Sequence, residues 1–272
     1  MDSPFPPAPA PPRRLAPRLL TAFIGIPLIL LIVWMGGAAF KVLCLLLAWG
    51  ALRELQVALG RSQRLGGAQI IGIVAYPAVF WAIWRGLAPA FAFVLLGLLL
   101  TLAALYYGRM TRLTLSSLAI TVLATLYVSL FALLPPLREA GRGELFYMTL
   151  FAVWASDTAA YYGGRALGRT PLSPLSPGKT NEGMLCGVFA ATLTAALIAG
   201  WAQFTPFQTA FLAIVVALAA PIGDLAESFW KRELGVKDMG TVFPGHGGIL
   251  DRCDSLLFSA LALSLYIDWV VG

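Results

Sequence analysis

Long apolar runs occupy most of this chain, and no other feature restricts its fold as strongly. Runs of about 20 residues without strict polar alternation indicate helices that cross a bilayer. Only 12% of the 272 residues are charged, against about 25% in soluble domains. The sequence therefore predicts an all-α integral membrane protein with about nine transmembrane helices. We place them at residues 19–35, 38–59, 68–84, 88–107, 115–137, 145–164, 184–203, 207–230 and 253–271.

Lysine and arginine are distributed unevenly over the connections between these runs. With the N-terminus in the cytoplasm, 15 of the 19 basic residues fall on the inner side. Because cytoplasmic loops are enriched in Lys and Arg, this bias predicts a cytoplasmic N-terminus. It also places the loops at 165–183 and 231–252 on the cytoplasmic side. The net charge of +6 comes from residues that flank the membrane, so it does not indicate nucleic-acid binding.

The chain divides into three predicted regions that differ in charge and composition. Residues 1–18 are rich in proline, and this composition favours a disordered cytosolic tail. Residues 19–140 hold the first five apolar runs and few acidic residues, which predicts a transmembrane scaffold. Residues 141–272 hold the last four runs and most of the acidic residues, which predicts the catalytic transmembrane region.

The predicted scaffold carries one acidic residue within its apolar part. Glu54 is the only acid between Asp2 and Glu139. We expect it near a helix end at the membrane interface, paired with Arg53 or Arg61, where the charges can reach water. The three cysteines lie in apolar surroundings, so they are predicted to be small core residues and not a disulfide framework.

One polar stretch, residues 221–254, interrupts the apolar pattern. It contains six of the 13 acidic residues and the only histidine of the chain. Charge is rare in this protein, so a cluster this dense at membrane level indicates either a catalytic site or a transport pathway. Asp224, Glu227, Ser228 and Lys231 are spaced so that all four share one helical face.

Acidic residues lie at both ends of that stretch. Asp251 and Asp254 are one turn apart at the start of the last expected helix. Helices on either side of one loop would bring Asp224 and Asp251 together, and a carboxylate pair of this kind suits Mg²⁺. The alternative for Asp224 is a salt bridge to Lys231 or Arg232.

Basic residues surround these carboxylates and are of the kind that binds phosphate groups. They are Lys231, Arg232, Lys237 and Arg252. A carboxylate pair with a ring of cations is suited to phosphoryl or nucleotidyl transfer, whereas anchoring at the membrane surface is the alternative for the cations. His246 would contact a phosphate or transfer a proton, although a phosphate nucleophile is already anionic and requires no base.

A second polar stretch, residues 157–183, is expected on the same side of the membrane. Ser176, Lys179 and Thr180 lie in a loop rich in Gly and Pro that could hold phosphates. It is not a Walker A loop, because position 173 is Ser where that motif requires Gly. An ordinary solvated connection is the alternative, but beside residues 221–254 the loop predicts a second wall of the site.

The charged residues of 228–254 resemble a family signature. The segments Ser228–Arg232, Lys237–Gly240 and Phe243–Asp254 match S-x-x-K-R-x4-K-D-x-G-x2-F-P-x-H-G-G-x-x-D-R-x-D, which is typical of phosphatidate cytidylyltransferases, also called CDP-diacylglycerol synthases. The upstream loop is similar to that family at Asp157, Thr158, Tyr161, Gly163, Arg165, Ser176, Pro177, Lys179, Thr180, Glu182 and Gly183. The resemblance covers residues 150–256, and the N-terminal part matches only in hydropathy. The departures are Gly178, Asn181, Pro221, Trp230 and Cys253.

The resemblance implies a transferase that moves CMP from CTP to phosphatidic acid for phospholipid synthesis. The products would be CDP-diacylglycerol and pyrophosphate, and the reaction would require Mg²⁺ held by Asp224 and Asp251, with a second cation left open. The catalytic residues that it implies are Lys231, Arg232, Lys237, Asp238, His246 and Arg252. The substrate-binding residues are Asp157, Ser176, Lys179, Thr180, Glu182, Glu227, Ser228 and Asp254.

The same resemblance implies CTP, phosphatidic acid and the lipid bilayer as partners, in the cytoplasmic membrane of the cell, and it leaves a homodimer open. Two other functions remain to be separated from this one. A CTP-dependent lipid kinase would direct the attack to the γ-phosphorus and release CDP. An ion-coupled transporter would use Asp224 as an intramembrane carboxylate, but its charges should be spread along a pathway through the membrane.

Overall fold

The computed structural model describes residues 15–62, 68–85, 115–139, 143–173, 176, 178–199, 205–243 and 247–267. Within these ranges all regular structure is helical. No strand occurs in them, and the only extended pairings there are two isolated bridges, Pro171 with Thr180 and Phe243 with Gly247. The predicted all-α class is therefore confirmed.

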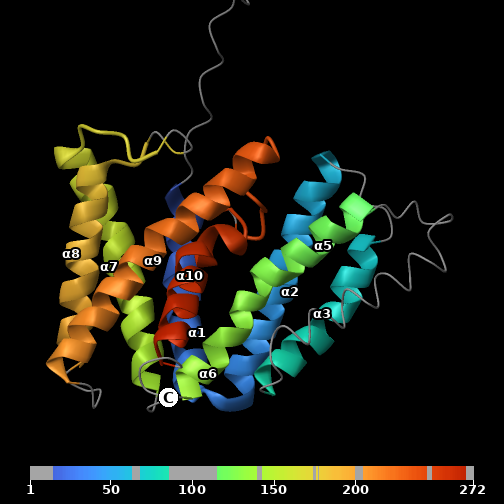
Figure 1. Cartoon of the computed structure of the whole chain (residues 1–272), viewed down its shortest axis with the longest axis horizontal. Helices are drawn as coiled ribbons and strands as arrows, with labels where there is room; N and C mark the ends of the chain where they lie inside the picture. Colours follow the sequence, from blue (N-terminus) through green and yellow to red (C-terminus); the bar gives the residue numbers. More distant parts are fainter. Residues whose placement is uncertain are drawn as a thin grey trace, which may run out of the picture.

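Within the described residues the N-terminal half is helical, and several of its helices stand side by side (Figure 1). The described helices are α1 (Leu15–Met35), α2 (Gly37–Ser62), α3 (Ala68–Trp84), α5 (Leu115–Val128), the 3-10 helix η1 (Ser129–Leu133) and α6 (Leu134–Glu139). The predicted helix at 115–137 is thus interrupted by a 3-10 segment. Pro135 and Pro136 follow it, and because proline has no backbone N–H, the carbonyls of the preceding turn lose their α-helical donors.

The C-terminal half contains four longer helices. They are α7 (Glu144–Leu167), α8 (Asn181–Ala199), α9 (Pro206–Glu233) and α10 (Leu250–Tyr266). The start of α9 is determined locally, because Thr205 and Gln208 form a capping box and Pro206 occupies the first turn. α7 and α8 lie side by side, and α9 crosses them at an angle (Figure 1).

Small residues allow the C-terminal helices to approach closely. A β-carbon on Gly183 of α8 would lie 2.7 Å from the carbonyl oxygen of Ala160 on α7. A β-carbon on Gly223 of α9 would lie 2.5 Å from the carbonyl oxygen of Asp254 on α10. Close backbone contact at small residues is a usual way for membrane helices to associate. The second contact brings the acidic segments of α9 and α10 together.

The halves share one hydrophobic core. Its largest fully buried apolar side chains come from α2, α3, η1, α9 and α10, so α10 packs against the N-terminal half as well as against α9. They are Leu52, Leu55, Tyr76, Phe131, Leu212, Leu250, Leu257 and Leu263.

Four helical segments of the described residues are long and apolar enough to cross a membrane, as expected for a multi-pass membrane protein. They are Gly37–Gly60, Ser116–Glu139, Asn181–Ile198 and Pro206–Glu233, and two shorter apolar helices are Phe23–Met35 and Gly72–Trp84. The expected span at 88–107 lies outside the described residues. The count of nine spans and the cytoplasmic position of the N-terminus stay predictions.

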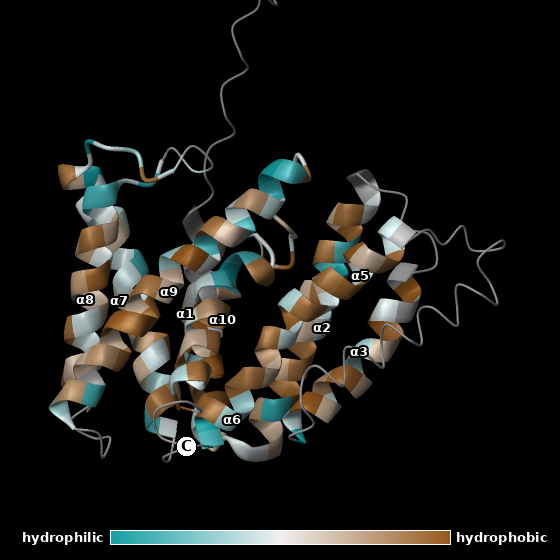
Figure 2. Ribbon diagram, viewed as in Figure 1, coloured by the Kyte–Doolittle hydropathy of each residue, from teal (hydrophilic) through white to brown (hydrophobic). Residues whose placement is uncertain are grey.

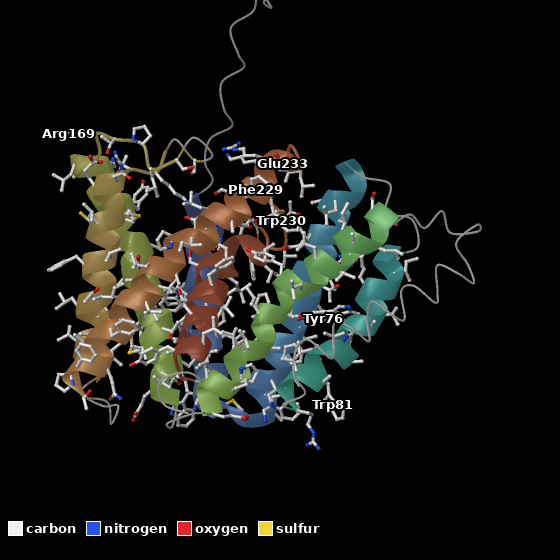
Figure 3. All side chains as sticks on the ribbon, in the orientation of Figure 1. Tyr76, Trp81, Arg169, Phe229, Trp230 and Glu233 are labelled. Atoms are coloured by element: carbon white, nitrogen blue, oxygen red, sulfur yellow. The ribbon has the colours of Figure 1, made fainter. Side chains whose placement is uncertain are left out.

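Hydrophilic residues gather at one end of the C-terminal helices, whereas the middle parts of the helices are mostly apolar (Figure 2). Arg169, after α7, and Glu233, at the end of α9, both lie at this end, and Trp81 lies at the opposite end (Figure 3). The two polar stretches of the sequence therefore meet at the same end of the molecule, as their expected placement on one side of the membrane requires.

Candidate active site

A polar cavity of about 700 Å³ lies between α7, α8, α9 and the start of α10. Its walls bring together residues from both polar stretches of the sequence. The lining residues are Ser156, Asp157, Ala160, Tyr161, Gly164, Arg165, Leu172, Gly178, Lys179, Thr180, Gly183, Met184, Pro221, Asp224, Glu227, Lys231, Asp238, Asp251, Arg252, Asp254 and Ser255. The cavity is large enough for a ligand of nucleotide size.

An ion pair connects two walls of this cavity. The ammonium group of Lys179, from the loop between α7 and α8, contacts the carboxylate of Asp224 on α9. The partner observed for Asp224 is therefore Lys179, a residue that the alternative of a salt bridge to Lys231 or Arg232 did not include. The loop between α7 and α8 thus lines the cavity opposite α9, and its role as a second wall of the functional site stays a prediction.

Three carboxylates lie close together on the α9–α10 side. Asp224, Glu227 and Asp254 each place an oxygen within 4.8 Å of the others. Glu227 is only 1% exposed and Asp254 is 8% exposed. Within the described part of the chain, Glu227 Oε1 is buried without a hydrogen-bond partner. A buried acceptor without a donor, beside two further carboxylates, fits a hard cation such as Mg²⁺.

Lys231 connects this acidic group to Asp251. Its ammonium nitrogen lies 2.5 Å from Glu227 Oε2 and 3.0 Å from Asp251 Oδ1. Asp251 Oδ2 accepts hydrogen bonds from the backbone N–H groups of Met239 at 2.9 Å and Gly248 at 2.8 Å. Asp251 therefore lies in the cavity wall beside the acidic group, with partners on both oxygens, while Glu227 and Asp254 are the carboxylates nearest to Asp224.

The loop between α7 and α8 is held by its own polar residues. Thr180 caps α8, because its hydroxyl oxygen accepts from the N–H of Gly183 at 3.1 Å. Glu182 Oε2 accepts from the N–H groups of Arg169 at 3.0 Å and Thr170 at 3.3 Å, and Glu182 Oε1 accepts from the Thr170 hydroxyl at 2.9 Å. Thr180 lines the cavity, whereas Glu182 holds the loop from outside it.

The structure brings ten of the predicted site residues into the cavity wall. They are Asp157, Lys179, Thr180, Asp224, Glu227, Lys231, Asp238, Asp251, Arg252 and Asp254. Five others do not line it, and they are Ser176, Glu182, Ser228, Arg232 and Lys237. His246 lies outside the described residues. Contact of any of these predicted residues with a substrate stays a prediction.

Sequence reasoning also missed residues of the site. Arg165 lines the cavity, although no role in the site was predicted for it. Its signal was available, because Asp157, Tyr161 and Arg165 repeat every four residues along one face of α7. Ser156 and Ser255 also line the cavity, and neither stands out in the sequence from other small polar residues near helix ends.

The expectation for Glu54 requires a correction. Instead of reaching water beside Arg53, Glu54 is buried at 8% exposure, and the side chain of Arg61 lies outside the described residues. Its Oε2 accepts from the N–H groups of Ile249 at 2.8 Å and Leu250 at 3.4 Å, at the start of α10. The physical reason is that the first N–H groups of a helix have no partners within the helix, so a buried carboxylate can satisfy them.

A second cavity, of about 300 Å³, adjoins the polar one and is mostly apolar. It lies between α1, α2, α7 and α10, and side chains such as Ile29, Leu47, Phe146 and Trp154 line it. Three residues belong to both cavities, namely Asp157, Arg252 and Ser255. The polar cavity and the apolar cavity are thus neighbours that share these three side chains.

Comparison with known proteins decides the family of this chain. A model of the cytidylyltransferase family matches residues 16–270. The chain belongs to the cytidylyltransferase family. The match includes both polar stretches and all helices that line the cavity, so the site described above is the polar site of a cytidylyltransferase-family chain.

Similar proteins carry a more specific name. The chain is 44% identical to the phosphatidate cytidylyltransferase of Helicobacter pylori (strain ATCC 700392 / 26695) over 138 residues, which are 50% of this chain and 51% of that protein. It is 46% identical to that of Synechocystis over 121 residues, 43% of this chain and 41% of that protein. It is 33% identical to that of Aquifex aeolicus over 233 residues, 85% of this chain and 83% of that protein. In the first two comparisons the chain spans about half the relative's length or less.

Proposed function

We propose that this cytidylyltransferase-family chain transfers CMP from CTP to phosphatidic acid, giving CDP-diacylglycerol and pyrophosphate. The observation that carries the proposal is the junction of a charged cavity with an apolar one at Asp157, Arg252 and Ser255. A reaction between a nucleotide and a lipid headgroup needs such a junction. The named relatives support the same substrates.

The charged cavity offers groups for both the metal and the phosphates of CTP. Asp224, Glu227 and Asp254 would hold Mg²⁺, and Asp251, the second ligand predicted from the sequence, lies beside them in the wall. Bound there, Mg²⁺ would neutralise phosphate charge and make the α-phosphorus more electrophilic. Asp251 would have to exchange its bond to Lys231 in order to join such a site.

The cationic side chains of the cavity would bind the anionic substrates. Lys179, Arg165 and Arg252 line different walls, so together they can contact the phosphates of a nucleotide and the headgroup of a lipid. A phosphate oxygen of phosphatidate would attack the α-phosphorus of CTP. The bond from that phosphorus to the bridging oxygen would break, and pyrophosphate would leave with the electron pair.

The lipid would enter sideways between helices, by way of the apolar cavity between α1, α2, α7 and α10, and would keep its acyl chains in the bilayer. Its headgroup would then reach Arg252, which lines both cavities. We further propose that the polar end faces the cytoplasm, where CTP is available, that the chain crosses the cytoplasmic membrane with nine helices, and that the N-terminal helices act as scaffold.

The test is a product assay with purified protein in detergent, phosphatidic acid, Mg²⁺ and CTP labelled at the α-phosphorus. Transfer of label to the lipid phase with release of pyrophosphate, stopped by a chelator, is the expected result. Label that remains in soluble CDP while the lipid is consumed would indicate a lipid kinase. No lipid-dependent use of CTP would refute the proposal and favour the transporter. Full turnover by Asp224→Asn would refute the role of Asp224 as a ligand, and full turnover by Asp251→Asn that of Asp251.

A further inference from the structure

The carboxylate of Glu54 connects the N-terminal half of the chain to the start of α10. Glu54 belongs to α2 and is separated by 195 residues from Ile249, whose N–H it accepts at 2.8 Å. It also accepts from the N–H of Leu250 at 3.4 Å. These are the first amides of α10, which have no partners within the helix, so the carboxylate of Glu54 supplies the acceptor that they need.

The loop before α10 is shaped to admit this carboxylate. Gly240 and Gly248 both face it, and a β-carbon at either position would overlap the carboxylate atoms of Glu54. Neither glycine has a positive φ angle, so backbone conformation alone does not require glycine there. Glu54 occupies the space that a side chain would fill, and this explains why both positions are glycine.

Glu54 and Asp251 hold neighbouring parts of the same backbone. Asp251 Oδ2 accepts from the N–H groups of Met239 and Gly248, and Glu54 Oε2 accepts from the two residues that follow Gly248. The two carboxylates therefore bind three consecutive amides at the entry to α10. A shift of that entry would move Asp251 and Arg252, which both line the polar cavity.

A buried carboxylate within a transmembrane helix is costly, and a neutral hydrogen-bonding residue could cap α10 at lower cost. What the structure shows at Glu54 is a direct connection from α2 to the backbone of Ile249 and Leu250 at the start of α10. Charge-assisted hydrogen bonds are shorter and stronger than neutral ones, so they fix a backbone position more tightly.

We propose that Glu54 is a positioning residue for cytidylyl transfer. It acts through the start of α10, where it fixes the placement of Asp251 and Arg252 at the polar cavity. This inference rests on the proposed function, because its main readout is the rate of that reaction. It assigns a role in the chemistry to a helix of the N-terminal half that does not itself line the polar cavity.

The first test compares Glu54→Gln, Glu54→Ala and wild type, with kcat calculated per folded protein from a thermal unfolding measurement. Loss of a carboxylate that orients a catalytic group typically reduces activity about 10–100-fold. We expect a loss of this size in kcat for Glu54→Ala, with the KM for CTP little changed, because positioning acts on the transition state. Glu54→Gln keeps an acceptor oxygen of the same reach and should recover part of the loss.

A matched control removes a carboxylate elsewhere. Glu139→Gln breaks the ion pair with Lys41 at the opposite end of the molecule and should leave kcat unchanged. If Glu54→Ala is too unstable to purify, Glu54→Gln alone must still lower kcat below that of Glu139→Gln. Equal kcat values in these two variants would overturn the inference.

A double variant separates positioning from general destabilisation. Gly248→Ala should lower kcat in wild type, because the new β-carbon overlaps Glu54. In the Glu54→Ala background this overlap is absent, so adding Gly248→Ala should lower kcat little further. The β-carbon of Gly187→Ala would meet Ser156 instead, so this substitution should change kcat by the same factor in both backgrounds.

The outcomes distinguish the two proposals. Wild-type protein that makes no CDP-diacylglycerol would overturn both of them. An active wild type with full kcat in Glu54→Ala, or a Gly248→Ala loss that is the same factor with and without Glu54, would overturn only the role of Glu54.

Discussion

Removal of the Lys231 charge tests the ionic network of the site most directly. Its ammonium lies 2.5 Å from Glu227 and 3.0 Å from Asp251, whose side chains are only 1% and 3% exposed. Lys231→Met keeps the length of the side chain and leaves two buried carboxylates without their shared cation. Breaking a buried ion pair in this way costs about 3–5 kcal/mol. We expect Lys231→Met to lower the free energy of unfolding by that amount when no divalent cation is present.

Mg²⁺ should restore part of this loss if it binds the neighbouring carboxylates as proposed. Glu227 belongs both to the Lys231 network and to the group with Asp224 and Asp254. A ligand at 100 times its Kd that binds only the folded state adds about 2.7 kcal/mol of stability. We therefore expect Mg²⁺ to stabilise Lys231→Met more than it stabilises wild type.

The assay is unfolding of purified protein by SDS titration in mixed micelles, with and without Mg²⁺. Lys41→Met is the control, because Lys41 also forms an ion pair at 2.5 Å, but its partner Glu139 is 47% exposed. Even with its contact to the ring of Trp84, that lysine should contribute less than about 2 kcal/mol. A loss in Lys231→Met no larger than in Lys41→Met would refute the reasoning from burial.

Three further predictions follow from single contacts. Asp254→Asn should raise the Mg²⁺ concentration for half-maximal activity about 10–100-fold, and an unchanged activation curve would exclude Asp254 as a ligand. Thr205→Ala removes the capping box of α9 and should lower stability by about 1 kcal/mol without a change in kcat; an altered kcat would contradict the assignment of Thr205 to stability alone. Trp230→Leu removes a stacked ring pair with Tyr127, whose centroids are 5.9 Å apart, and should lower stability by about 1 kcal/mol by the same titration. A Trp230 variant as stable as wild type would show that this stacking is not needed.

Much of the site could be predicted because many of its residues are close together in the sequence and lie on one helix. Asp224, Glu227 and Lys231 share a face through helical periodicity alone, and all three line the cavity. The placement of the loops at 165–183 and 231–252 at one end of the molecule agrees with their predicted position on one side of the membrane, whereas the specific pairing of Lys179 with Asp224 was not predicted. Trp230 is one of the residues that depart from the family signature, and its ring stacks on Tyr127 of α5.

The choice among carboxylates could not be predicted from spacing. Asp224 and Asp251 come from opposite ends of one loop, and their separation in space depends on how closely α9 and α10 approach. That approach is determined at Gly223, where a side chain would meet the carbonyl of Asp254. The same contact brings Asp254 next to Asp224, while Asp251 is turned toward Lys231 and the backbone of the preceding loop.

Glu54 shows why contacts between distant parts of the chain could not be predicted from the sequence. Sequence reasoning finds partners for a charge among its neighbours, and Arg53 is adjacent. The groups that bind Glu54 are backbone amides, which carry no mark in a sequence, and they are 195 residues away. The only trace they leave is at Gly240 and Gly248, where the family signature has glycine without a turn that needs it. At Gly240 and Gly248 the physical reason for glycine is thus a close neighbour, and that neighbour is a carboxylate from a distant helix.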